Sequence, residues 1–286
     1  MSLITTVEAT PGRVLGSFRY LVAYGPLKLE NLAGQLWPVT TRGERANFDR
    51  ALRLEMIESG LVEETEEGLN LSSGLPEIIK KGPDTAEKYL PAVITDLVMS
   101  GPERNRDLAY ALAWYLSLDP RNAPGDDMGA LNQAEEDGVK DLINVTSDAT
   151  YGQFEDWVKY LGFGWLLPAS TDGSRVRLVP DPTQYLRRIL PEILPDVGRP
   201  MAIADFRNQL AERAPVFEGG YLRDDIDSRT GRPLNTGEIA PTTALALLRL
   251  VDEGVIELTA PSDAGVHILP FGESSRVSYI TRNSPE

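Results

Sequence analysis

One arrangement of residues recurs three times along this 286-residue chain. In each case apolar residues at helical spacing run into a glycine, and an apolar strand pattern follows that glycine. The three glycines are Gly60, Gly162 and Gly254. Glycine is common just past a helix end because it tolerates positive φ, so one such ending would say little. Three similar endings predict a repeated unit in which helices lead into a β-hairpin.

Two more helical patterns precede each ending. They cover 13–24 and 29–36, then 86–98 and 105–118, and finally 184–194 and 203–214. The first ending predicts strands at 61–64 and 69–71, and the second predicts two strands joined across the turn Asp172-Gly173. At the third ending, we expect Val255–Leu258 to form a hairpin with Val266–Leu269.

Three helices followed by a hairpin resemble the winged helix-turn-helix family. The resemblance implies tandem winged-helix modules, and the fold class is therefore mainly α with small β-hairpins, an α+β fold. Turn-rich stretches divide the chain into a winged-helix domain (1–75), a winged-helix-like helical domain with an acidic insertion (84–182) and a C-terminal winged-helix domain (183–286). The last domain contains a long polar loop at 215–241, and loops of that length are usually functional or disordered.

The charge of the chain limits how it can meet nucleic acid. Its net charge of −15 argues against a protein that coats DNA through its overall field. Between Asp126 and Asp156, nine acidic residues stand against Lys140 alone, and this stretch would repel phosphate. Any DNA contact must therefore be local.

The third helical pattern of the first module offers such a contact. From Val39 to Arg53 there are four arginines against Glu44 and Asp49, and the side chains at 42, 45, 49 and 53 share one outward face. Arginine suits this role because its planar guanidinium contacts phosphate or guanine bidentately. With the basic second hairpin included, the predicted DNA-binding residues are Thr40, Thr41, Arg42, Arg45, Arg50, Arg53, Arg175 and Arg177. The alternative is a solvated helix face with internal ion pairs.

Nothing in the sequence points to catalysis. His267 is the only histidine, there are no cysteines, and neither a metal-binding spacing nor a Walker A loop is present. Acidic pairs such as Asp126-Asp127, and Asp224-Asp225 with Asp227, could hold a divalent cation, but solvated acidic loops explain them more simply. We therefore expect no enzyme activity, no cofactor and no metal site.

The location of the protein follows from what the sequence lacks. The N-terminal residues do not combine a basic start with an apolar stretch, and no apolar run approaches the roughly 20 residues of a membrane span. The lack of cysteine fits a reducing compartment. We expect a cytoplasmic protein without membrane contact.

The opening PGRVLGSFRYLVAYGP, the winged-helix ending after it and the helical middle resemble accessory proteins of bacterial phage-defence islands. The accessory component of DNA 7-deazaguanine modification and restriction systems is the family in question. This resemblance implies a non-catalytic subunit that helps helicase, nuclease or ATPase partners engage double-stranded DNA.

Two other functions stay open. The acidic stretch and the apolar segment 108–118, which reads as buried, fit a scaffold subunit that binds proteins without touching DNA. The third possibility is a winged-helix transcription regulator, which would be a homodimer on a palindromic site.

Overall fold

The computed structural model describes residues 3–4, 10–36, 56–57, 59–100, 105–124, 126–168, 177–261, 265–271 and 276–284. Within these residues the chain is mainly helical with small antiparallel strand pairs, which confirms the predicted α+β class. The chain forms two compact units. The first unit comprises Met1–Leu108 and Asn144–Leu161, and the second comprises Ala109–Ile143 and Gly162–Glu286.

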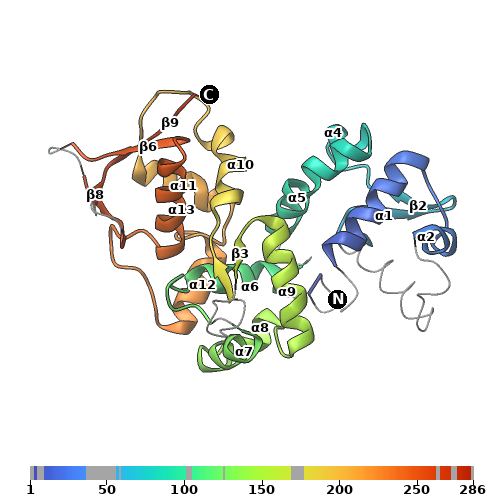
Figure 1. Ribbon diagram of the computed structural model, residues 1–286, viewed down its shortest axis with the longest axis horizontal. Coiled ribbons are helices and arrows are strands. Elements are labelled where there is room, and N and C mark those ends of the chain that lie inside the picture. Colours follow the sequence, from blue (N-terminus) through green and yellow to red (C-terminus); the bar gives the residue numbers. More distant parts are fainter. Residues whose placement is uncertain are drawn as a thin grey trace. The chain divides into compact units, whose positions relative to one another are not determined.

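The first unit is built around two packed helices. Its elements are α1 (Pro11–Tyr24), α2 (Leu29–Leu36), β1 (Val62–Thr65), β2 (Gly68–Leu71), α4 (Glu77–Lys80), α5 (Pro83–Met99) and α9 (Asp148–Leu161). α1 packs against α5, and α9 contacts both (Figure 1). Val14, Phe18 and Leu21 are buried because spacings of four and three residues place them on one face of α1.

The first glycine ending has the predicted form. Met56 and Ile57 are helical, and Gly60 follows with φ of +81°. The amide of Gly60 donates to the Ile57 carbonyl (3.0 Å), and the amide of Leu61 donates to the Met56 carbonyl (3.1 Å). These two bonds satisfy carbonyls at the helix end, and the left-handed backbone that they need favours glycine. β1 and β2 then pair antiparallel, as predicted.

The second unit contains the remaining elements. They are most of α6 (Arg106–Ser117), then α7 (Asp127–Glu136), α8 (Lys140–Ile143), β3 (Gly164–Leu167), β4 (Arg177–Pro180), α10 (Thr183–Ile193), β5 (Met201–Ala202), α11 (Ile203–Arg213), α12 (Tyr221–Thr230), α13 (Pro241–Asp252), β6 (Ile256–Thr259), β7 (His267–Ile268), β8 (Arg276–Val277) and β9 (Tyr279–Arg282). α10 packs against α13. The apolar segment 108–118 is buried as predicted, apart from the half-buried Ser117.

The third glycine ending is confirmed, but its predicted hairpin is wrong. α13 ends at Asp252, Gly254 follows with φ of +71°, and β6 comes next. β6 pairs with β9 (Figure 1), whereas β7 pairs with β8. The reason is burial: Ile280 of β9 is fully buried opposite Leu258, while Val266 and Ile268 are exposed. Val266 and Ile268 therefore do not contribute to the core beside β6.

Near each end of the chain, the strands pair with one another in the same pattern. In the second unit β5 lies between α10 and α11 and pairs with β9, which gives the sheet order β5-β9-β6. In the first unit Leu27 lies between α1 and α2 and pairs with Leu69 of β2, beside β1. In both places a short segment after the first helix, the strand β5 in one and the single bridge residue Leu27 in the other, pairs with the last strand. That last strand also pairs with the strand that follows the glycine.

The second glycine ending is divided between the units. α9 belongs to the first unit and ends at Leu161, whereas Gly162, which has φ of +82°, belongs to the second unit together with β3 and β4, which pair antiparallel. The predicted turn Asp172-Gly173 lies outside the described residues. The division into domains 1–75, 84–182 and 183–286 stays a prediction.

Candidate functional site

Most of the predicted DNA-binding residues lie outside the described part of the chain. These are Thr40, Thr41, Arg42, Arg45, Arg50, Arg53 and Arg175. Arg177 begins β4 and is half-buried, and its Nη2 donates to the carbonyl of Pro120 (2.8 Å). Part of its guanidinium is therefore already engaged within the second unit.

The β1–β2 hairpin, which follows the arginine-rich segment in the chain, is acidic. Glu63 and Glu64 lie on β1, Glu66 and Glu67 form the turn, and all four are exposed. Four carboxylates on one small hairpin repel phosphate. This hairpin therefore offers no phosphate contact of its own.

The segment 215–241 is not the long loop that we predict from its polar sequence, because it contains α12. Leu222 and Ile226, one helical turn apart, are buried. The helix starts after Gly220, where a Cβ atom would lie 2.4 Å from the Cα of Pro215. Only glycine fits this close approach. The many charged residues of this segment make its sequence resemble a solvated loop. In the structure some of these charged residues are buried.

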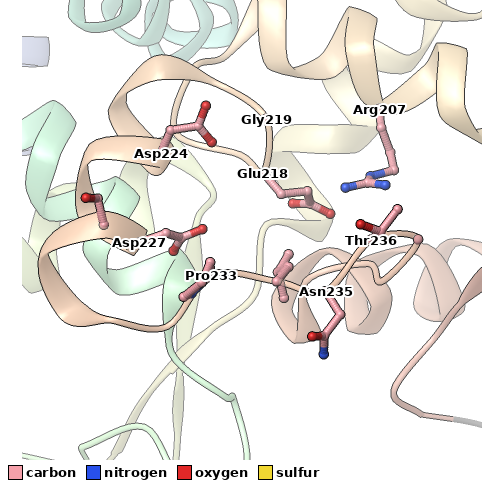
Figure 2. Close-up of a pocket in the computed structure, with 11 residues that line it drawn as sticks. Arg207, Glu218, Gly219, Asp224, Asp227, Pro233, Asn235 and Thr236 are labelled. Atoms are coloured by element: carbon pink, nitrogen blue, oxygen red, sulfur yellow. The ribbon is translucent and has the colours of Figure 1, made fainter.

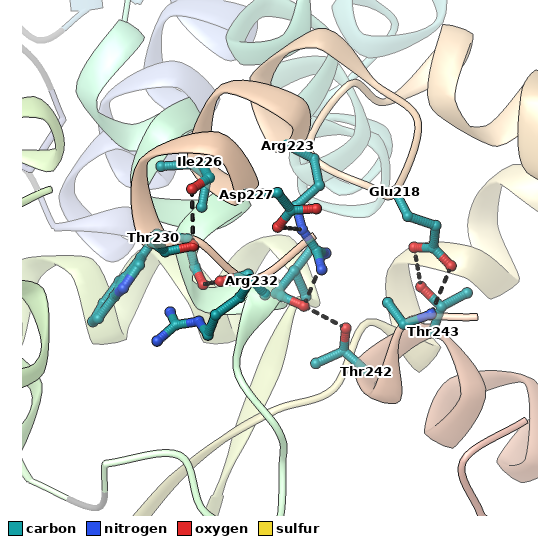
Figure 3. Close-up of polar contacts among 12 residues, drawn as sticks. Glu218, Arg223, Ile226, Asp227, Thr230, Arg232, Thr242 and Thr243 are labelled. Atoms are coloured by element: carbon teal, nitrogen blue, oxygen red, sulfur yellow. Dashed lines mark hydrogen bonds and ion pairs between the residues drawn. The ribbon is translucent and has the colours of Figure 1, made fainter. Parts of the chain in front are cut away.

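Arg223 of α12 is the most deeply buried of these charges, with 1% of its surface exposed. Its Nε donates to Asp227 Oδ1 (2.7 Å), and its Nη1 donates to the carbonyl of Leu116 (3.2 Å) (Figure 3). The Thr242 hydroxyl also donates to this carbonyl, which lies in the last turn of α6 and has no helical partner. Burial raises the pKa of Asp227, although the charge of Arg223 opposes this effect. The expectation of a solvated acidic loop is therefore wrong for Asp227.

Glu218 caps a helix from a distant position in the chain. Its Oε1 accepts a hydrogen bond from the amide of Ala240 (3.1 Å), and its Oε2 accepts one from the Thr243 hydroxyl (2.7 Å). Ala240 stands at the N-cap of α13 and has no capping side chain of its own. A carboxylate is favourable there because it satisfies a free amide at the positive end of the helix dipole.

Asp137 belongs to the acidic stretch that we expect to repel phosphate, but it is buried and neutralised. Trp114 Nε1 (2.8 Å) and Gln133 Nε2 (3.0 Å) donate to it, and Arg232 binds both of its oxygens at 2.7 Å. Burial alone would raise the pKa of Asp137, but the hydrogen bonds from Arg232, Trp114 and Gln133 together lower it below its ordinary value. Arg232 thus joins the chain after α12 to the end of α7.

A cavity of about 660 Å³ lies against the same segment. Figure 2 shows Arg207 reaching from α11 toward Glu218, with Asp224 and Asp227 across the cavity. The Nε of Arg207 is buried and has no hydrogen-bond partner among the described residues. Sequence reasoning singled out only Asp224 and Asp227, since no motif links them to Arg207, Glu218 or Asn235. In the part of the chain that the structure describes, no three acidic or histidine side chains converge as metal ligands.

These features define a mainly helical α+β protein with recurring helix–glycine–strand endings and a polar network around α12. The chain belongs to the DpdG-like family, whose model matches residues 1–264. Membership points to a component of the Dpd modification and defence system and suggests protein partners, in agreement with the resemblance to the 7-deazaguanine accessory component. Comparisons with curated proteins and with solved structures give no match. Among the described helices, none has the length and apolar character needed to cross a membrane.

Proposed function

We propose that this protein is a non-catalytic DNA-binding adaptor of a Dpd system, with winged-helix modules at both ends of the chain. The observation that carries this proposal is the pattern of strand pairing, which is the same near both ends of the chain. Helix, short strand, two helices and two strands is the order of a winged helix-turn-helix, in which the third helix enters the major groove. The C-terminal module departs from this order, because three helices (α11, α12 and α13) lie between β5 and β6 and the pair β7–β8 lies between β6 and β9. In the first module, the third helix is expected at the arginine-rich segment 39–53, which ends three residues before Met56 in the sequence.

The charges support an adaptor rather than an autonomous DNA-binding protein. The segment 39–53 has a local charge of +2 within a chain of net charge −15, and the hairpin that follows it is acidic. A contact made by one helix alone would be weak and sensitive to salt. Protein partners of the same system would then supply the remaining affinity.

We expect the variant R42A/R45A/R53A to bind duplex DNA more weakly than the wild type at low salt. Each lost phosphate contact should reduce the slope of log K against log salt concentration by about one, so the slope should fall by about three. Fluorescence anisotropy with a labelled duplex over a salt series measures both quantities. The variant R199A/R229A/R276A, which removes the same charge elsewhere, is the matched control. Equal affinity and slope in all three proteins would refute the DNA contact.

A second candidate function is a scaffold that binds proteins without DNA, and the exposed glutamates of the β1–β2 hairpin favour it. The variant E63Q/E66Q/E67Q separates the two functions. If the protein is a DNA-binding adaptor, the variant should bind duplex DNA more tightly, because repulsion from phosphate is lost. If it is a scaffold, the variant should lose a partner that co-purifies with the wild type at native expression, and neither protein should bind DNA. Retention of every partner together with unchanged DNA affinity would count against any role for the hairpin.

A further inference from the structure

The cavity beside α12 combines one unpaired cation with several carboxylates. Arg207 stands on α11, Glu218 lies just before α12, and Asp224 and Asp227 lie on α12 (Figure 2). Its volume of about 660 Å³ is within the range of small-molecule sites. We propose that this cavity binds a zwitterionic ligand of the arginine or lysine type, with a carboxylate against Arg207 and a side-chain cation against the carboxylates.

Arg207 is the evidence for the anionic group of the ligand. Its buried Nε lacks a hydrogen-bond partner in the described part of the chain, and no ion pair involves its guanidinium there. A buried donor without a partner is unfavourable, and a ligand carboxylate would satisfy it through a bidentate, charge-assisted contact. The buried Nδ1 of His267 also lacks a partner among the described residues, and it lies close enough to feel the charge of Arg207. Burial and then that charge lower the pKa of His267.

The carboxylates are the evidence for the cationic group. Glu218 is 4% exposed, and the hydrogen bonds that its oxygens accept come from two neutral donors, the amide of Ala240 and the hydroxyl of Thr243. Asp224 is exposed at the cavity, and Asp227 faces the cavity while its Oδ1 is held by Arg223. These groups do not converge as ligands of a metal ion within the described chain, so an extended organic cation fits them better.

The rest of the lining favours an aliphatic chain between the two charged groups. Pro233 and Leu234 provide apolar surface, and the Asn235 amide provides a further hydrogen-bonding group. The described residues that line the cavity include no aromatic ring on which a nucleobase would stack. A free amino acid and the C-terminal arginine or lysine of a peptide both carry the required pair of groups.

Isothermal titration calorimetry on the full chain tests the proposal with L-arginine, with agmatine, and with the peptide Ala-Ala-Arg carrying a free or an amidated C-terminus. We expect L-arginine or the free-ended peptide to bind at least about tenfold more tightly than agmatine or the amidated peptide, since these lack the carboxylate. Binding of free arginine would identify a small-molecule site. Binding of the peptide alone would identify a site for the chain end of a partner protein.

Two substitutions assign the binding to this cavity. R207Q should weaken binding of the best ligand at least about tenfold, and D224N should weaken it severalfold. E212Q, on an exposed position of α11 that does not line the cavity, is the matched control and should bind as the wild type does. Thermal unfolding without ligand checks that each variant is folded. The proposal is overturned if none of the four compounds binds at millimolar concentration, if the best ligand binds no more tightly than its counterpart without the carboxylate, or if folded R207Q binds as the wild type does.

Discussion

Replacing Arg223 with alanine is expected to lower the free energy of unfolding of the second unit by about 3–5 kcal/mol at neutral pH. The substitution leaves the carboxylate of Asp227 buried without its counter-charge, and it removes one of the two donors to the Leu116 carbonyl. Urea denaturation measures the loss.

Because burial already raises the pKa of Asp227, loss of Arg223 should raise it further. A raised pKa means that the folded state binds the proton more readily, so part of the lost stability should return as the pH falls from 7 to 5.

The same helix provides the control for this experiment. Arg229 and Asp225 form an ion pair with the same i,i+4 spacing, but both side chains are partly exposed, so R229A should change stability by less than about 1 kcal/mol. The double variant R223M/D227N, which removes both charges of the buried pair, should be more stable than R223A. If R223A lowers the free energy of unfolding no more than R229A does, the buried pair does not stabilise α12.

Replacing Asp137 with asparagine is expected to lower the free energy of unfolding by roughly 2 kcal/mol at pH 7. Asparagine still accepts a hydrogen bond from Trp114, but it loses the charge that Arg232 binds with two hydrogen bonds. The estimate lies below the value for a fully buried pair because the side chain of Arg232 is 38% exposed.

The direction of the pKa shift of Asp137 determines how the stability difference between wild type and D137N changes with pH. The pKa of Asp137 in the folded protein lies below its ordinary value, so its contribution to stability is complete at pH values above that ordinary value. It is lost as the pH falls through the lower folded value. Urea denaturation from pH 7 toward pH 3 should therefore show wild type and D137N converging. E135Q, which removes the exposed partner of Lys140, should match the wild type throughout. A constant gap between wild type and D137N would refute the ionic origin of the effect.

Local features of the fold could be predicted because they depend on a few neighbouring residues. The helix endings at Gly60 and Gly254 need a left-handed backbone within one turn of the helix end, and glycine provides it. The burial of 108–118 follows from an apolar run on every side of the helix. The antiparallel pairing of β1 and β2 across a two-residue turn is local as well.

Non-local features could not be predicted in the same way. The pairing of β6 with β9 depends on which of two candidate strands presents a buried residue opposite Leu258, and Ile280 does so. α12 escaped prediction because its charged residues look solvated until Arg223 is placed beside the Leu116 carbonyl, 107 positions away in the chain.

The recurring helix–glycine–strand endings, the α+β class and the local excess of positive charge at 39–53 can all be read from the order of the residues, because backbone preference and local charge act over short distances. The partners of buried charges cannot be read in this way. Arg232 meets Asp137, and Glu218 caps α13, only after folding brings distant segments together. Removing a charged group from water is unfavourable unless a partner compensates it, so packing selects which acidic residues stay at the surface and which become part of the core.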